Sequence, residues 1–149
     1  MVILPLPRRR RRANWGARAG MGITVVAAAD LILYAFLLAQ PGGPLGQQAG
    51  PAGHRALFVA GYLALLAVLG VTGTHVSRPA ARLLIFGFTA GAGLGMGVLG
   101  MASIGPPLLL ISALSVVAIT QVAERTWGPI VTGVYAAFVV LLLGIGFTG

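Results

Sequence analysis

The sequence predicts an all-α integral membrane protein, a compact bundle of five transmembrane helices. Of its 149 residues, 58% are hydrophobic, and the mean hydropathy is +0.97. Only 8% are Asp, Glu, Lys or Arg, whereas a soluble domain carries roughly 25% charged residues. This charge is too small to cover a water-facing surface, so a soluble globular domain is excluded. An intrinsically disordered chain is excluded as well, because disorder requires low hydrophobicity.

Residues 1–20 are expected to form a basic cytoplasmic tail. The tail holds Arg8 to Arg12 and Arg18, six of the ten arginines. A basic cluster beside the first apolar segment orients a membrane protein and attracts anionic lipids. We therefore expect Arg8–Arg12 to contact anionic lipids and, despite the net charge of +8, no nucleic acid partner. A signal peptide is the competing interpretation, but its apolar region is usually about 7 to 15 residues long, shorter than the stretch 22–39.

The transmembrane domain is expected to comprise residues 21–149. Its predicted spans are 22–39, 56–75, 83–101, 107–123 and 130–148. Each has about 17 to 20 residues, which at about 1.5 Å per residue matches a hydrocarbon core of roughly 30 Å. Prolines and glycines separate the spans, because proline lacks the amide donor that a helix interior needs. The fourth segment is the most polar, so four spans plus a re-entrant fourth segment are the alternative.

The arginine distribution predicts a cytoplasmic N-terminus and an external C-terminus. With this orientation the inner side holds the tail arginines, Arg78, Arg82 and Arg125, and only Arg55 lies outside. This asymmetry is the one that the positive-inside rule requires. The short loops and the lack of targeting motifs favour a multi-pass protein of a bacterial plasma membrane.

Asp30 is the most unusual residue of the first span, because it lies near the predicted midplane of the bilayer. An ionisable residue at that depth costs several kcal/mol unless it is paired, hydrated or protonated. Tyr34 lies one turn further along the same face, and Ser112 and Ser115 lie near the middle of the fourth span. These four residues form a candidate proton or cation site. The alternative is a neutral, hydrogen-bonded Asp30 that joins helices or contacts a partner subunit.

Glycines form two rows on the third span. Gly87, Gly91 and Gly95 repeat every four residues, and Gly93 and Gly97 form a second face about 200° round the helix. Rows of small residues allow helix backbones to approach closely in lipid. We therefore expect the third span to be the packed centre of the bundle or of a homo-oligomer. A conduit walled by bare backbone is the alternative.

The sequence contains no pattern of residues that indicates an enzyme. Cysteine and lysine are absent, which excludes thiolate nucleophiles, cysteine-ligated metals and Schiff-base lysines. His54 and His75 are about 31 Å apart along a helix and cannot share a metal. Asp30 and Glu124 differ in depth, so no carboxylate pair forms. We expect no catalytic residues, no metal and no cofactor.

Two functions are compatible with these patterns. The first is a structural or accessory membrane protein that packs through its glycine-rich third helix into a homo-oligomer or with other membrane subunits. The second is a small transporter or channel in which Asp30 binds a proton or a cation. The sequence names neither a substrate nor a partner.

Overall fold

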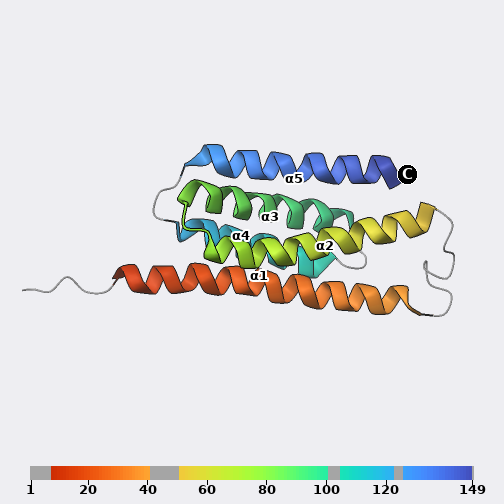
Figure 1. Ribbon diagram of the computed structural model, residues 1–149, viewed down its shortest axis with the longest axis horizontal. Coiled ribbons are helices and arrows are strands. Elements are labelled where there is room, and N and C mark those ends of the chain that lie inside the picture. Colours follow the sequence, from red (N-terminus) through yellow and green to blue (C-terminus); the bar gives the residue numbers. More distant parts are fainter. Residues whose placement is uncertain (1–7, 41–50, 101–104, 123–125, 149) are drawn as a thin grey trace, which may run out of the picture.

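A computed structural model of the protein describes residues 8–40, 51–100, 105–122 and 126–148 (Figure 1). The prediction of an all-α fold with five helices is confirmed. The helices are α1 (Arg8–Leu38), α2 (Pro51–His75), α3 (Pro79–Leu99), α4 (Gly105–Thr120) and α5 (Trp127–Thr148).

Four of the five helices are long and apolar enough to cross a membrane. These candidate spans are Trp15–Leu38, Gly53–His75, Pro79–Leu99 and Trp127–Phe147. Helix α4 has 16 residues, about 24 Å of helix, and is shorter than a typical span. The chain is thus a small polytopic membrane protein with four candidate spans. Residues 101 and 123, the last residues of the predicted third and fourth spans, lie outside the described part of the chain.

Helix boundaries follow the breakers in the sequence. Pro79 occupies the first turn of α3, and Arg78 before it is extended, with φ −74° and ψ 120°, as a residue preceding proline prefers. Prolines also stand in the first turns of α2 and α4, where a missing amide donor leaves no hydrogen bond unmade. Helix α1 is continuous from Arg8, so the basic cluster and the first span share one helix.

Helix α3 lies at the centre of the bundle. In the apolar 18-residue stretch of its candidate span 61% of the residues are buried, against 22% to 33% in the corresponding stretches of the other three. It packs mainly against α4 and α5, and α1 packs against α2 and α4 (Figure 1). Successive helices run in alternate directions, so α3 and α5 are parallel to each other. The largest fully buried side chains include Phe86, Ile23, Leu63, Leu66 and Leu108.

The first glycine row of α3 faces α5. A Cβ atom at Gly87 would lie 2.6 Å from the carbonyl oxygen of Ile130, and one at Gly91 would lie 3.0 Å from the Cα atom of Val134. Both neighbours are backbone atoms, which cannot move aside without shifting the helix. At Gly95 the nearest atoms belong to side chains of α5. The backbones of α3 and α5 therefore touch along this row.

The second glycine row faces α4. A Cβ atom at Gly93 would lie 2.6 Å from the carbonyl oxygen of Leu108, and one at Gly97 would lie 2.8 Å from a side-chain carbon of Leu109. The two rows thus serve two different neighbours of α3. Both are covered by helices of the same chain.

Candidate functional site

Asp30 lies on the face of α1 that points into the bundle. Ile23 and Ala27 on the same face are fully buried, and Tyr34 is half-buried one turn further on. The opposite face of α1 carries Ile32, which is 70% exposed. Asp30 itself is only 3% exposed. Its carboxyl group is therefore enclosed by protein and not by lipid.

Neither carboxylate oxygen of Asp30 has a hydrogen-bond partner within the described residues. In the same part of the chain, the one other buried polar side-chain atom without a partner is Nε of Arg82. No group of three or more His, Cys, Asp or Glu residues that could hold a metal occurs among the described residues. Asp30 is thus an isolated acidic group in an apolar interior.

Contacts along α1 give the depth of Asp30 in the bundle. A Cβ atom at Gly16 would approach Gln121, and one at Gly22 would approach Leu114 at 3.2 Å. Because α1 and α4 are antiparallel, the eight residues from Gly22 to Asp30, about 12 Å of helix, lead to the level of the first turn of α4. Figure 1 shows the beginning of α4 beside the second half of α1.

Helix α2 forms another wall at this level. Near the middle of the α1–α2 contact, the Thr24 hydroxyl donates to the carbonyl oxygen of Ala67 at 3.1 Å. Six residues further along α1, Asp30 is level with the region of Tyr62 on the antiparallel α2. The Tyr62 hydroxyl donates to the carbonyl oxygen of Ala137 on α5 at 3.4 Å. Tyr62 therefore joins α2 to α5 and does not pair with Asp30.

The two predicted serines lie between α3 and α4. The Ser112 hydroxyl donates to the carbonyl oxygen of Ala90 at 2.9 Å. Ser115 and Thr89 share a hydrogen bond of 2.8 Å, and both hydroxyls are buried. The structure thus divides the predicted site. Asp30 and Tyr34 share the inner face of α1, whereas the serines join α3 to α4 nearer the other end of the bundle.

Three interior polar residues were missed by sequence reasoning, namely Thr24, Tyr62 and Thr89. Each bonds a backbone carbonyl: Thr89, for example, donates to Phe86 on its own helix at 3.1 Å. A threonine in an apolar helix can satisfy its hydroxyl on the preceding turn, so it leaves little signal in the sequence. Thr89 could have been found only by asking which α3 residue lies level with the serines of α4.

The histidines add nothing to this site. His75 makes local contacts of 2.9 Å to the Thr74 hydroxyl and to the Val71 carbonyl oxygen. His54 is exposed near the start of α2. Glu124 lies outside the described residues.

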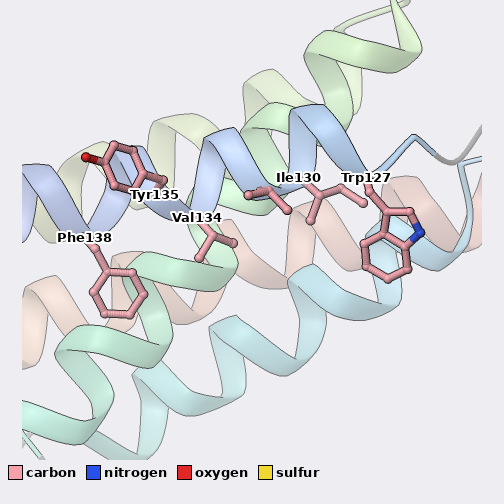
Figure 2. A pocket seen from close by; sticks show the side chains of 6 residues that line it. Trp127, Ile130, Val134, Tyr135 and Phe138 are labelled. Carbon is pink, nitrogen blue, oxygen red and sulfur yellow. The ribbon is translucent and has the colours of Figure 1, made fainter.

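A second feature is an apolar groove on the outer face of α5. It has a volume of about 440 Å³ and is lined by Trp127, Ile130, Val131, Val134, Tyr135 and Phe138. Figure 2 shows Tyr135 on α5 with the other side chains that line the groove. Tyr135 is 71% exposed, close to the middle of the candidate span Trp127–Phe147. This places a phenol hydroxyl at hydrocarbon depth.

No protein-family model, curated protein or solved structure matches this chain. Its four candidate spans place it in a lipid bilayer. Any more specific role follows from the chemistry of its own residues.

Proposed function

We propose that this protein moves protons or small cations across the membrane, with Asp30 as the group that binds them. The observation that carries the proposal is a carboxyl side chain that is 3% exposed and lacks a hydrogen-bond partner within the described residues. An ionised carboxylate in such a site costs several kcal/mol. A bound proton or cation removes that cost, which is why intramembrane acids mark ion pathways.

The depth of Asp30 supports this role. Within the candidate span Trp15–Leu38, Asp30 is about 22 Å from one end and about 12 Å from the other. An ion held there is separated from both membrane surfaces. Helix α4 begins at the same level, and helix ends at membrane depth line ion sites in many transporters. We assign Tyr34, one turn nearer the Leu38 end, to the path between Asp30 and that surface.

The proposal also includes the orientation of the chain in the membrane and its contacts with lipid. The arginine distribution favours a cytoplasmic Trp15 end of α1 and an external C-terminus, and we propose that the membrane is a bacterial plasma membrane. Arg8–Arg12, in the first turns of α1, contact anionic lipids. The role is not enzymatic. Ser112 and Ser115 pack α3 against α4, because their hydroxyls are already bonded to Ala90 and Thr89 of α3.

A flux assay in proteoliposomes tests the proposal. Purified protein is reconstituted with a pH-sensitive dye inside the vesicles, and a potassium diffusion potential drives proton entry. A parallel series uses a sodium-sensitive dye and a sodium gradient. We expect wild-type flux of one of the two ions, its loss in Asp30→Asn, and partial retention in Asp30→Glu. Ser112→Ala is the matched control, because it removes an interior polar group from the α3–α4 contact.

The flux results can be compared if every variant elutes from a gel-filtration column at the wild-type size. Loss of flux in Asp30→Asn with retention in Ser112→Ala supports the proposal. Equal flux in Asp30→Asn and wild type overturns it, and so does wild-type flux no greater than that of empty vesicles.

A second candidate function is a structural or accessory role in an oligomer, and the outer face of α5 favours it. The glycine rows of α3 are covered within the chain, but Tyr135 is exposed near the middle of its span. At that depth lipid tails offer no acceptor, and an unsatisfied polar group in hydrocarbon costs several kcal/mol. In a parallel two-fold dimer through α5, a second copy brings the same hydroxyl to the same depth.

Cysteine cross-linking tests this dimer, because the native chain contains no cysteine. In membranes, Val131→Cys on the α5 groove should cross-link into a dimer, whereas Val25→Cys on the exposed face of α1 should not. Tyr135→Phe should lower the dimer yield of Val131→Cys. Equal cross-linking at both positions, or none at Val131→Cys, would overturn the assignment of the α5 face.

A further inference from the structure

Arg82 lies between helices at one end of the bundle. It lies in the first turn of α3 and is half-buried, with its Cζ atom 5.7 Å from the centre of the Phe86 ring. A Cβ atom at Gly16 on α1 would lie 2.7 Å from Nη2 of Arg82 and 3.6 Å from the Cβ atom of Gln121, just after α4. The absence of a side chain at Gly16 therefore makes room for the guanidinium group between α1, α3 and the end of α4.

The guanidinium group lacks an acceptor for one of its buried donors. The Nε atom of Arg82 is buried and has no hydrogen-bond partner within the described part of the chain. A guanidinium group stays charged and presents five N–H donors in a planar fork. A buried donor left unsatisfied costs about 1–3 kcal/mol, and more when it is charged. The position therefore favours an anionic, oxygen-rich ligand that the described residues do not supply.

The surroundings of Arg82 match the depth of lipid headgroups. Trp15, next to Gly16 on α1, is 56% exposed, and Trp127, at the start of α5, is 74% exposed. Tryptophans concentrate at membrane interfaces. Arg78 is exposed one turn before Arg82, and Arg18 stacks on Trp15 at 5.6 Å. Figure 1 shows the end of α4 beside the first half of α1, with the start of α3 at the same end of the bundle.

We propose that Arg82 binds the phosphate group of an anionic phospholipid between α1, α3 and the end of α4. Arginine pairs with phosphate through two parallel N–H···O bonds. Basic sites between helices at the cytoplasmic surface recognise lipid headgroups in this way. Phe86 and Gly16 hold the guanidinium group in place, and Arg78 adds the positive field that favours an anionic lipid over a zwitterionic one.

Native mass spectrometry of the full chain in detergent tests the site. Phosphatidylglycerol and phosphatidylcholine are titrated separately, and the lipids that remain bound are counted. We expect one tightly bound phosphatidylglycerol in the wild type. Arg82→Gln should weaken its binding about tenfold or more, which corresponds to about 1.4 kcal/mol, and Arg82→Lys should weaken it less, because lysine lacks the planar fork. Arg18→Gln is the matched control, since it removes the same charge at the same end of the bundle.

Three other outcomes would contradict a lipid-binding site at Arg82. Equal loss in Arg82→Gln and Arg18→Gln would show a general electrostatic attraction, and equal binding in Arg82→Gln and wild type would show that another group holds the lipid. Displacement of the lipid by excess inorganic phosphate would assign the site to a soluble ion. Each result overturns the proposal and is independent of the role of Asp30.

Discussion

Buried polar side chains have hydrogen-bond partners in the contact between α3 and α4. On the inner face of α1, the buried Asp30 has none within the described residues. Between α3 and α4, the hydroxyls of Thr89, Ser112 and Ser115 all make hydrogen bonds. On the inner face of α1, Asp30 is buried to a similar degree but has no partner within the described residues. Thr89, Ser115 and Asp30 are all buried, so the difference in hydrogen bonding does not arise from exposure.

This difference in hydrogen bonding distinguishes polar residues that pack helices together from one that we propose to bind an ion. Hydroxyls that find acceptors on neighbouring helices hold those helices together, each contributing about 0.6 kcal/mol on average in membrane proteins. A buried carboxylate without a partner destabilises the fold. The burial of an unpaired acid on this face is the reason why we propose Asp30, and not the serines, as the ion-binding group.

The largest predicted effect concerns the packed region. Gly93→Ala should lower the free energy of unfolding by about 1–3 kcal/mol, because the new Cβ atom would lie 2.6 Å from the Leu108 carbonyl oxygen and 2.9 Å from the Ser112 amide nitrogen. Unfolding in mixed micelles, followed by circular dichroism, measures the change.

Gly61→Ala on α2 provides the control for Gly93→Ala. A Cβ atom at Gly61 has nothing within 4 Å, so this change should stabilise the helix by up to about 1 kcal/mol. If both alanine variants had the same stability, the close contact between α3 and α4 would be contradicted.

The next effect has the opposite sign and concerns Asp30. Asp30→Val should raise the free energy of unfolding by about 1 kcal/mol or more, because replacing an unpaired buried acid by an apolar side chain removes its desolvation cost. The same micelle titration measures it, with Asp30→Asn as the variant of matched volume. A loss of stability in Asp30→Val would mean that the carboxyl group has a stabilising partner.

The smallest effect is the coupling between Thr89 and Ser115. A double-mutant cycle of Thr89→Val and Ser115→Ala should give a coupling energy of about 0.6 kcal/mol, the average for such bonds in membrane proteins. Both residues are fully buried, so the cycle reports their hydrogen bond without a contribution from solvent. A coupling energy of zero would show that the two hydroxyls do not interact.

Helix positions could be predicted because their signals are local. Hydropathy and the prolines in the first turns of α3 and α4 indicate where helices begin, and a rotation of 100° per residue places Gly91 and Gly93 on different faces of α3. Relative depth could not be predicted in this way. The centre assigned to the first span assumed a start near Met21, whereas the apolar part of α1 begins at Trp15, which moves Asp30 away from the level of Ser115.

The membrane class, the helical fold and the single acid inside the first span all follow from the amino-acid sequence, because hydropathy is a property of residues that are neighbours in the chain. The helix packing was needed to show that α5 and α4 cover the two glycine rows and that Thr89 pairs with Ser115. It was also needed to show that Asp30 has no partner in the described part of the chain. Which side chains meet across two helices depends on how far the helices shift and rotate before their backbones touch, and residues close in sequence do not determine this.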